Sequence, residues 1–188
     1  EGTFDIVTGY FTIGALAWLS NDVNHKISKF RMVLGDIVNF DVESNRPLDL
    51  LNENISIEAA LKLNKLSQEA VRFLKQDKVF AKTLEPNFCH AKSYLFNPDT
   101  NERNKYFVTG SSNLTEAGIG LRFAHNIELN IGETGNNNQF KELCEWFELL
   151  WQSPKTHEEK TLVAADSKQT KIDFKKYLIN EIEKIFIE

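Results

Sequence analysis

The stretch FCHAKSYLFNPDTNERNKYFVTGSSNLTEAG, residues 88–118, contains the features that indicate the fold and the site. Two runs in it, residues 88–96 and 105–110, are rich in aromatic and β-branched residues, which is typical of strands. The Asn-Pro and Asp-Thr-Asn sequences between them are typical of a turn, so the runs are predicted to form a hairpin. Polar groups interrupt this apolar pattern in two places, at a His-x-Lys sequence and at a Gly-Ser-Ser-Asn sequence.

Strand-like and helix-like segments alternate through the rest of the chain. Further strands are predicted at residues 4–11, 30–37, 78–84 and 125–131, and helices from residue 13, over 57–74, over 140–151 and from residue 172 onward. The polar residues 152–170 are predicted to be a linker or an irregular excursion. Strands interspersed with helices predict an α/β fold, with a mixed central β-sheet flanked by helices and an added C-terminal helix.

The composition is that of a globular protein, with 188 residues, 41% hydrophobic and 26% charged. No apolar run approaches the roughly 20 residues that a membrane helix needs. The N-terminal segment lacks the basic start and the cleavage site of a signal peptide, so a cytoplasmic protein is predicted. The chain has no initiator Met and its last residues are helix-like, so we expect it to be a piece of a longer protein.

The net charge of −5 restricts the ways in which this chain could bind nucleic acid. Domains that bind nucleic acid unaided usually carry clustered positive charge, because phosphate neutralisation supplies much of the affinity. A DNA partner would therefore require a local basic cleft and the help of another module. Cys89 and Cys144 are too few for a disulfide scaffold, and Cys144 falls on the apolar stripe of the helix predicted over 140–151.

The His-x-Lys sequence has a definite geometry in an extended strand. His90 and Lys92 are two residues apart, so both project to the same side, with Tyr94 beyond them. Cys89 then faces the other way, which argues against a zinc site built from Cys89 and His90, and no further Cys or His pair completes four ligands. No metal and no other cofactor is predicted.

The remaining polar candidates lie downstream. Residues 110–113 offer two hydroxyls, an amide and free backbone N–H groups where a strand ends, and such turns bind anions well. In HNIELNI, alternation places Ile127, Leu129 and Ile131 on an apolar face and Glu128 on a polar face. A carboxylate in mid-strand is costly to bury without a partner, and a nearby imidazolium is a natural one.

Each of these signals has an ordinary structural explanation when it is taken singly. A histidine in a strand is most often structural, a Gly-Ser-Ser-Asn sequence is most often a turn or a helix cap, and Glu128 is most often a surface charge. Their combination in one short window favours a phosphate-binding site.

His90-x-Lys92, followed by Gly110-Ser111-x-Asn113 and then by Glu128, resembles the signature of the phospholipase D superfamily. The resemblance extends to the Tyr-Phe pair and helix near the N-terminus and to the FCHAKSYLF context of the histidine, and it covers roughly residues 4–151. Within the superfamily the chain is most similar to the compact branch with a single HxK motif. That branch includes bacterial nucleases, restriction endonucleases and PLD-like domains fused to helicases.

The resemblance implies a metal-independent phosphodiesterase that cleaves DNA through a phosphohistidine intermediate. It implies a catalytic set of His90, Lys92, Asn113 and Glu128, in which His90 is the nucleophile or the acid and Glu128 orients the imidazole. Lys92, Ser111 and Asn113 would bind the phosphate oxygens. The chemistry needs two imidazoles and the chain has one His-x-Lys motif, so a homodimer with a shared active site is predicted.

The resemblance also implies how the chain is divided into domains. Residues 1–151 would be the catalytic domain, and 152–188 a linker and a C-terminal helix that lead to a missing region. The chain would be the nuclease module of a larger restriction or helicase-like protein, whose fused helicase or recognition domain supplies the grip on DNA.

Two departures from the family pattern keep alternatives open. The NPDTNERN insertion lengthens the His-to-Ser spacing, which a longer hairpin accommodates, and Asn97 stands where the family often has Asp. Asn97 supports one alternative, a non-catalytic PLD-like domain that binds phosphate or mediates dimerisation. The other alternative, a phospholipid-processing enzyme, is disfavoured by the single motif and by the lack of an interfacial helix with a basic face.

Overall fold

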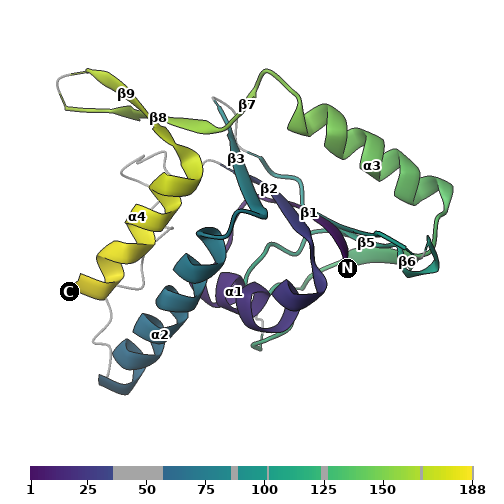
Figure 1. Ribbon diagram of the computed structural model, residues 1–188, viewed down its shortest axis with the longest axis horizontal. Coiled ribbons are helices and arrows are strands. Elements are labelled where there is room, and N and C mark those ends of the chain that lie inside the picture. The colour runs from purple at the N-terminus through teal and green to yellow at the C-terminus, as the bar shows by residue number, and fades with distance from the viewer. Residues whose placement is uncertain (36–56, 86–88, 101, 124–126, 166, 188) are drawn as a thin grey trace.

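The computed structural model describes residues 1–35, 57–85, 89–100, 102–123, 127–165 and 167–187. A mixed sheet of seven strands runs through its centre, in the order β6-β5-β4-β1-β2-β3-β7 (Figure 1). The strands are β1 Gly2–Thr8, β2 Lys29–Leu34, β3 Val79–Leu84, β4 Ser93–Pro98, β5 Tyr106–Gly110, β6 Asn130–Thr134 and β7 Thr156–His157. The three central strands β1, β2 and β3 are parallel, and β4, β5, β6 and β7 are each antiparallel to their neighbours.

Helices cover both faces of the sheet. They are α1 Ile13–Trp18, α2 Ile57–Leu74, α3 Asn138–Trp151 and α4 Phe174–Ile187, and α1 continues into the short turns η1 Leu19–Val23 and η2 Asn24–Lys26. One hydrophobic cluster joins α1, α2 and α4 to one face, and a second joins α3 to the other (Figure 1). Ile6 and Val7 are adjacent in β1 and both fully buried, as expected for a strand that is covered on both faces. The predicted fold class is confirmed.

The apolar periodicity of α2 matches its packing. Ala70, Phe73 and Leu74 are fully buried, and the Phe73 ring meets the Phe30 ring of β2 edge to face at 4.9 Å. The helix occupies the predicted range, Ile57–Leu74. In α4, Phe174, Leu178 and Ile182 pack in the same cluster, so the predicted C-terminal helix is confirmed and its stripe is covered by this chain.

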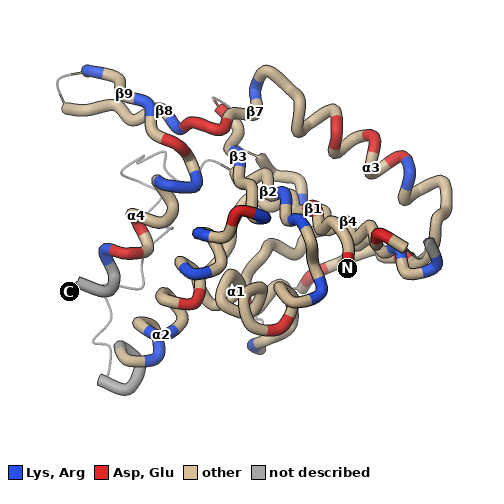
Figure 2. The backbone as a smooth tube through the Cα atoms, in the orientation of Figure 1, with Lys and Arg blue, Asp and Glu red and all other residues tan. Residues whose placement is uncertain are grey.

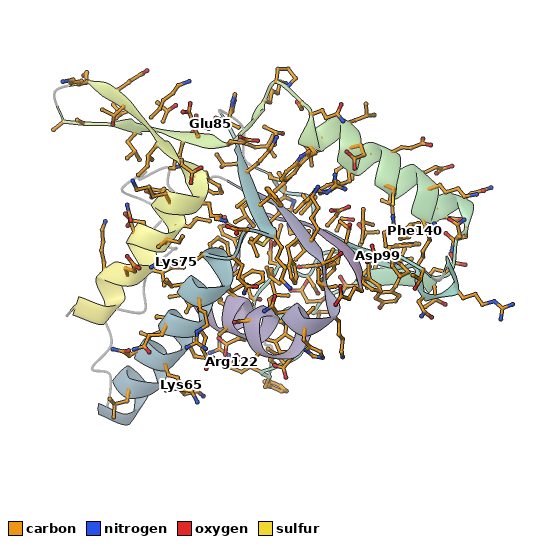
Figure 3. All side chains as sticks on the ribbon, viewed as in Figure 1. Lys65, Lys75, Glu85, Asp99, Arg122 and Phe140 are labelled. Atoms are coloured by element: carbon orange, nitrogen blue, oxygen red, sulfur yellow. The ribbon has the colours of Figure 1, made fainter. Side chains whose placement is uncertain are left out.

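Helix α3 is capped by Asn137, whose side-chain oxygen accepts a hydrogen bond from Phe140 N at 2.8 Å. The helix turns Phe140 and Phe147 into the second cluster, and Figure 3 labels Phe140 at its start. Cys144 is half-buried beside them, and burial raises the pKa of its thiol to about 11. A reduced, weakly reactive cysteine follows from this environment.

An ion-pair network fastens α3 to the sheet. Arg31 of β2 donates from Nε and Nη2 to the two carboxylate oxygens of Asp5, both at 2.7 Å, and from Nη1 to Glu148 of α3 at 2.6 Å. The guanidinium also lies 4.8 Å from the centroid of the Phe147 ring. Burial raises the pKa of Asp5, against the lowering effect of Arg31.

The prediction for residues 152–170 is wrong. These residues form β7, which pairs with β3 at the sheet edge, and most of a two-stranded hairpin of β8 Glu159–Val163 and β9 Gln169–Asp173. Glu85, labelled in Figure 3, accepts a hydrogen bond from Thr161 N at 3.0 Å and ties the hairpin to the end of β3. Short, mostly polar edge strands bury few apolar side chains, so they lack the alternation that identifies a strand.

Three strand boundaries also differ from prediction. The strand predicted at 4–11 ends at Thr8, the one predicted at 88–96 begins at Ser93, and the one predicted at 125–131 is Asn130–Thr134. The ladder between β1 and β4 begins at the Val7–Ser93 pair, so residues 89–92 lie before the strand. His125 and Asn126 lie outside the described residues.

Charges of both signs are interspersed along α2, α4 and the β8–β9 hairpin (Figure 2). Among the helices that the structure describes, none is both long enough and apolar enough to cross a membrane.

Candidate active site

The site residues gather at one end of the sheet, where four strands start or stop. Val7, Ser93, Thr109 and Ile131 are partners across β1, β4, β5 and β6. The row beyond them consists of Thr8, Lys92, Gly110 and Asn130, in which Gly110 pairs with Asn130 and Gly110 N donates to Lys92 O at 3.3 Å. Because side chains alternate along strands, Thr8 at the end of β1 faces the α1 side, like Ile6.

Lys92 is a buried cation, with only 6% of the residue exposed. Its Nζ donates to the His90 carbonyl oxygen at 2.6 Å, which uses one of three donors. Within the described residues no Asp or Glu oxygen lies within 4.0 Å of this ammonium. A buried charge without a counter-charge is costly, and an anion that enters beside Lys92 removes that cost.

Asn113 is held with its amide nitrogen available. Its Oδ1 accepts from Tyr10 N at 3.2 Å and lies 3.3 Å from Thr8 Oγ1, and Thr8 Oγ1 in turn accepts from Leu114 N at 3.0 Å. These contacts fix which side of the amide is oxygen, and Nδ2 makes no hydrogen bond to the residues that the structure describes. Asn113 therefore presents a donor, as a phosphate ligand must.

The turn that follows β5 is clamped to the residues around the start of β6. Ser111 Oγ donates to Glu128 Oε2 and accepts from Leu129 N at 2.9 Å, while Ser111 N donates to Leu129 O at 3.1 Å. The amide of Asn130 bonds to Ser112 twice: Oδ1 accepts from Ser112 N at 3.2 Å, and Nδ2 donates to Ser112 Oγ at 2.7 Å. The hydroxyl of Ser111 reaches a phosphate only by releasing Glu128.

The expectation that this turn offers free backbone N–H groups is wrong at three positions. Ser111 N, Ser112 N and Leu114 N donate within the protein, to Leu129 O, Asn130 Oδ1 and Thr8 Oγ1. A clamped turn satisfies its own donors, so any anion here must be bound mainly by side chains.

Gly110 is required because the backbone of β6 passes close to it. A Cβ placed at Gly110 would lie 2.3 Å from Leu129 O and 2.7 Å from the Cα of Asn130. The glycine therefore allows the clamp that positions both Ser111 and Glu128.

His90 is exposed at the open end of this row, and the neighbouring Cys89 is buried in the cluster beneath α3. The predicted alternation thus holds although residues 89–92 are not paired as a strand. Burial raises the pKa of the Cys89 thiol. The predicted contact between Glu128 and the imidazole stays a prediction.

Asn97 lies far from these groups. It pairs with Thr3 at the start of β1, whereas the site lies beyond the Val7–Ser93 pair at the other end of β4. Five residues of extended strand separate Asn97 from Lys92 by about 16 Å. The Asp-to-Asn departure therefore cannot change a contact with the phosphate.

Sequence reasoning missed two supporting residues, Thr8 at the end of β1 and Tyr10 just after it, and gave no role to Tyr94 of β4. Tyr94 donates its hydroxyl to Ser112 O at 2.9 Å, and burial raises the pKa of this phenol above its usual range. The position of Thr8 and Gly9 directly after an apolar strand was the available signal, since polar residues at strand ends often line sites.

Comparison with solved structures finds similarity to NucT from Helicobacter pylori. The two chains are 12% identical with a TM-score of 0.47, and the match covers 81% of this chain and 80% of that one. No protein-family model matches the sequence, and no curated protein does. The functional argument therefore rests on the residues of the site.

The donors at this end of the sheet suit an oxyanion. The ammonium of Lys92 and the amide N–H₂ group of Asn113 are directed by their neighbours, and His90, two residues before Lys92, is exposed. Within the described residues no three His, Cys, Asp or Glu side chains lie close enough together to hold a metal ion.

Proposed function

We propose that the chain is a phosphodiesterase of the phospholipase D type that cleaves DNA. The buried, uncompensated ammonium of Lys92 is the observation that carries the proposal. A phosphodiester supplies the missing negative charge, and a nucleophile, His90, lies two residues away. The family resemblance of the His-x-Lys, Gly-Ser-x-Asn and Glu sequences supports the same chemistry.

In the proposed reaction the neutral imidazole of His90 attacks phosphorus, so an N–P bond forms while the bond to the leaving oxygen breaks. A second histidine, in its protonated form, gives its proton to that oxygen. Water then attacks the phosphohistidine, loses a proton to the second histidine and releases His90. Lys92 and Asn113 stabilise the charge that gathers on the non-bridging oxygens.

The carboxylate of Glu128 has the orienting role in this proposal. Ser111 and the backbone of residues 128–130 hold the carboxylate at the edge of the site. A carboxylate so placed favours one tautomer of the His90 imidazole and stabilises its positive charge.

We propose that the second histidine comes from a second copy of the chain. Among the described histidines, His25 lies in η2, before β2 begins, at the opposite end of the sheet from Thr8. His157 lies in β7, four strand positions from β4 and hence about 19 Å away. A twofold axis that brings two copies of His90 together would complete the site.

An exposed apolar segment beside the site supports this dimer. Leu121, Phe123, Ile127 and Leu129 are 49%, 83%, 99% and 76% exposed, and they follow directly on the turn that carries Asn113. Such a concentration of large apolar side chains is unusual on the surface of a monomer. Burial against a second copy would cover it.

We further propose that this chain is the nuclease module of a larger restriction or helicase-like protein. The net charge of −5 and the mixed charges on α2 and α4 (Figure 2) favour a module that relies on an attached domain for most of its grip on DNA. The complete reading frame tests this proposal, and a neighbouring domain without any nucleic-acid-binding character would contradict it.

The test of the activity uses plasmid DNA and a chromogenic phosphodiester, each incubated with the chain in EDTA. Cleavage of both that survives chelation and disappears in His90→Ala is the expected result. Phosphate or DNA binding without turnover would instead indicate the non-catalytic alternative, and turnover of choline phospholipid alone would indicate the lipid enzyme. Cleavage that EDTA abolishes would overturn the metal-independent mechanism. An acid-stable covalent intermediate, in place of an acid-labile phosphohistidine, would overturn the role of His90.

A further inference from the structure

A second concave feature lies on the opposite face of the sheet, between α3 and the strands β4, β5 and β6. This α3 cleft has a volume of about 480 Å³. The side chains that matter here are the hydroxyls of Ser93 and Thr109 in the sheet and four apolar groups: Leu129 just before β6, Ile131 of β6, and Leu143 and Trp146 of α3.

The α3 cleft adjoins the candidate active site. Ser93 and Thr109 pair with each other in the row next to Lys92 and Gly110, and Lys92 and Gly110 also line the cleft. Three residues of chain span at most about 10 Å, so Ser93 lies within that distance of His90. A single nucleotide, from its phosphate to the far edge of its base, can bridge that span.

The polar groups of the cleft are neutral. Ser93 is 2% exposed, and its Oγ has no hydrogen-bond partner in the part of the chain that the structure describes. Thr109 Oγ1 donates to Lys92 O at 2.9 Å, which leaves its lone pairs to accept. A buried hydroxyl without a partner is costly unless an incoming group bonds to it.

The apolar groups of the cleft include a stacking surface. Trp146 is 37% exposed at the rim, and Leu129 and Ile131 on the facing strand are 76% and 66% exposed. Lys92 is the one charged residue in the lining, and its ammonium is turned to the His90 carbonyl. The cleft therefore suits a flat, uncharged group with hydrogen-bonding edges, and not a phosphate.

We propose that the α3 cleft binds one base of the nucleic-acid strand whose phosphate lies at His90. Trp146 stacks on the base, and Ser93 and Thr109 bond to its polar edge. Stacking of a base on an aromatic side chain tolerates any sequence, while the hydroxyls add a preference among bases. This inference rests on the proposed phosphodiesterase function and adds a base-binding subsite to it.

The experiment compares two single-stranded oligonucleotides that differ at one residue, which carries a base in one and is abasic in the other. The unmodified chain should cleave next to the intact residue roughly tenfold faster, in kcat/KM, than next to the abasic one. Trp146→Ala should reduce this ratio to near one. Leu149→Ala is the matched control, since Leu149 is 75% exposed on the same helix and does not line the cleft, and it should keep the ratio.

Equal cleavage of both oligonucleotides by the unmodified chain would overturn the subsite and leave the phosphodiesterase proposal intact. An unchanged ratio in Trp146→Ala would also overturn it, as would a change in sedimentation of that variant, because Trp146 would then belong to an interface between copies. If neither oligonucleotide is cleaved, the phosphodiesterase proposal fails.

A binding measurement then tests the α3 cleft directly. Free nucleosides should quench the tryptophan fluorescence of the unmodified chain and should not quench that of Trp146→Ala. Absence of quenching in the unmodified chain would overturn the base-binding subsite.

Discussion

At the residue scale, the environment of Lys92 differs from that of two other lysines that contact the sheet. The structural lysines of this protein have partners: Lys82 lies 3.4 Å from Glu158, and Lys175 donates to two backbone carbonyls at 3.0 and 2.9 Å. Lys92 is more deeply buried than either of these two lysines, and its ammonium donates to a single backbone carbonyl. A buried ammonium without a counter-charge does not stabilise the fold, so its presence needs another explanation.

Replacement of Lys92 by Met should therefore stabilise the fold while it abolishes anion binding. Removal of the uncompensated charge should increase the free energy of unfolding by about 1 kcal/mol, which corresponds to roughly 2–4 °C in Tm. Thermal unfolding with and without inorganic phosphate measures both effects. Lys82→Met is the control and should lower Tm, and a Lys92→Met variant that unfolds more readily than the unmodified chain would contradict the functional assignment.

Asn97 provides the opposite case, a departure from the family pattern that should have no catalytic effect. Because Asn97 pairs with Thr3 at the far end of β4, Asn97→Asp should change kcat/KM on a chromogenic diester by less than about twofold. An increase in kcat/KM of tenfold or more would show that residue 97 affects the reaction, and would contradict this prediction.

At the scale of elements, the site depends on how closely the end of β5 and the start of β6 approach. Six hydrogen bonds between residues 111–112 and 128–130 hold this junction. Gly110 permits the approach, and Glu128 and Asn113 take their positions from it.

Gly110→Ala should separate β5 from β6, since its Cβ would lie 2.3 Å from Leu129 O. We expect a loss of stability of about 1–3 kcal/mol and a loss of at least tenfold in activity. Urea unfolding and diester hydrolysis measure the two effects. Thr134→Ala, at the exposed far end of β6, should leave both nearly unchanged; equal effects of the two substitutions would count against the close-approach argument.

The attachment of α3 depends on Arg31, which joins Asp5 to Glu148. Arg31→Met leaves the Asp5 carboxylate buried and unpaired, so the expected loss is about 3–5 kcal/mol. Glu148→Gln should cost under about 1 kcal/mol, because the side chain of Glu148 is 45% exposed.

The pH dependence of Arg31→Met follows from the pKa of Asp5, which burial raises already in the unmodified chain. A carboxyl with a raised pKa in the folded state binds more protons there than when unfolded, so its contribution to stability is lost as pH rises through that pKa. Without Arg31 the pKa rises further. The stability deficit of the variant, measured by urea unfolding, should therefore narrow as the pH falls from 7 to 5, and a deficit that widens would contradict this account.

At the scale of the whole molecule, one end of the sheet carries the candidate anion site and, close to it in the described part of the chain, several exposed apolar side chains. Function and association would then depend on the same surface. In the proposed reaction, which uses two imidazoles, such a surface would bring the second one from another copy of the chain.

Substitution of Phe123 and Ile127 by Ser together should produce a folded monomer that has lost cleavage and still binds phosphate at Lys92. These side chains are 83% and 99% exposed, so their removal should not disturb the core. Sedimentation, thermal unfolding and diester hydrolysis give the three readouts. Val163→Ser, on the distant β8–β9 hairpin, is the control, and a strict monomer of the unmodified chain that cleaves diesters would rule out the shared site.

The sequence by itself determined the α/β architecture, because helix α2 and the central strands carry strong apolar periodicity that local propensity and burial both favour. Its resemblance to a family signature also predicted His90, Lys92, Ser111, Asn113 and Glu128 as site residues, and their roles stay a prediction. Only the tertiary structure decided that residues 156–157, 159–163 and 169–173 are strands, that the backbone N–H groups of Ser111 and Ser112 donate within the protein, and that Asn97 lies far from Lys92. The physical reason is that hydrogen bonds between segments distant in sequence satisfy polar groups, and those partners are not specified by any local pattern.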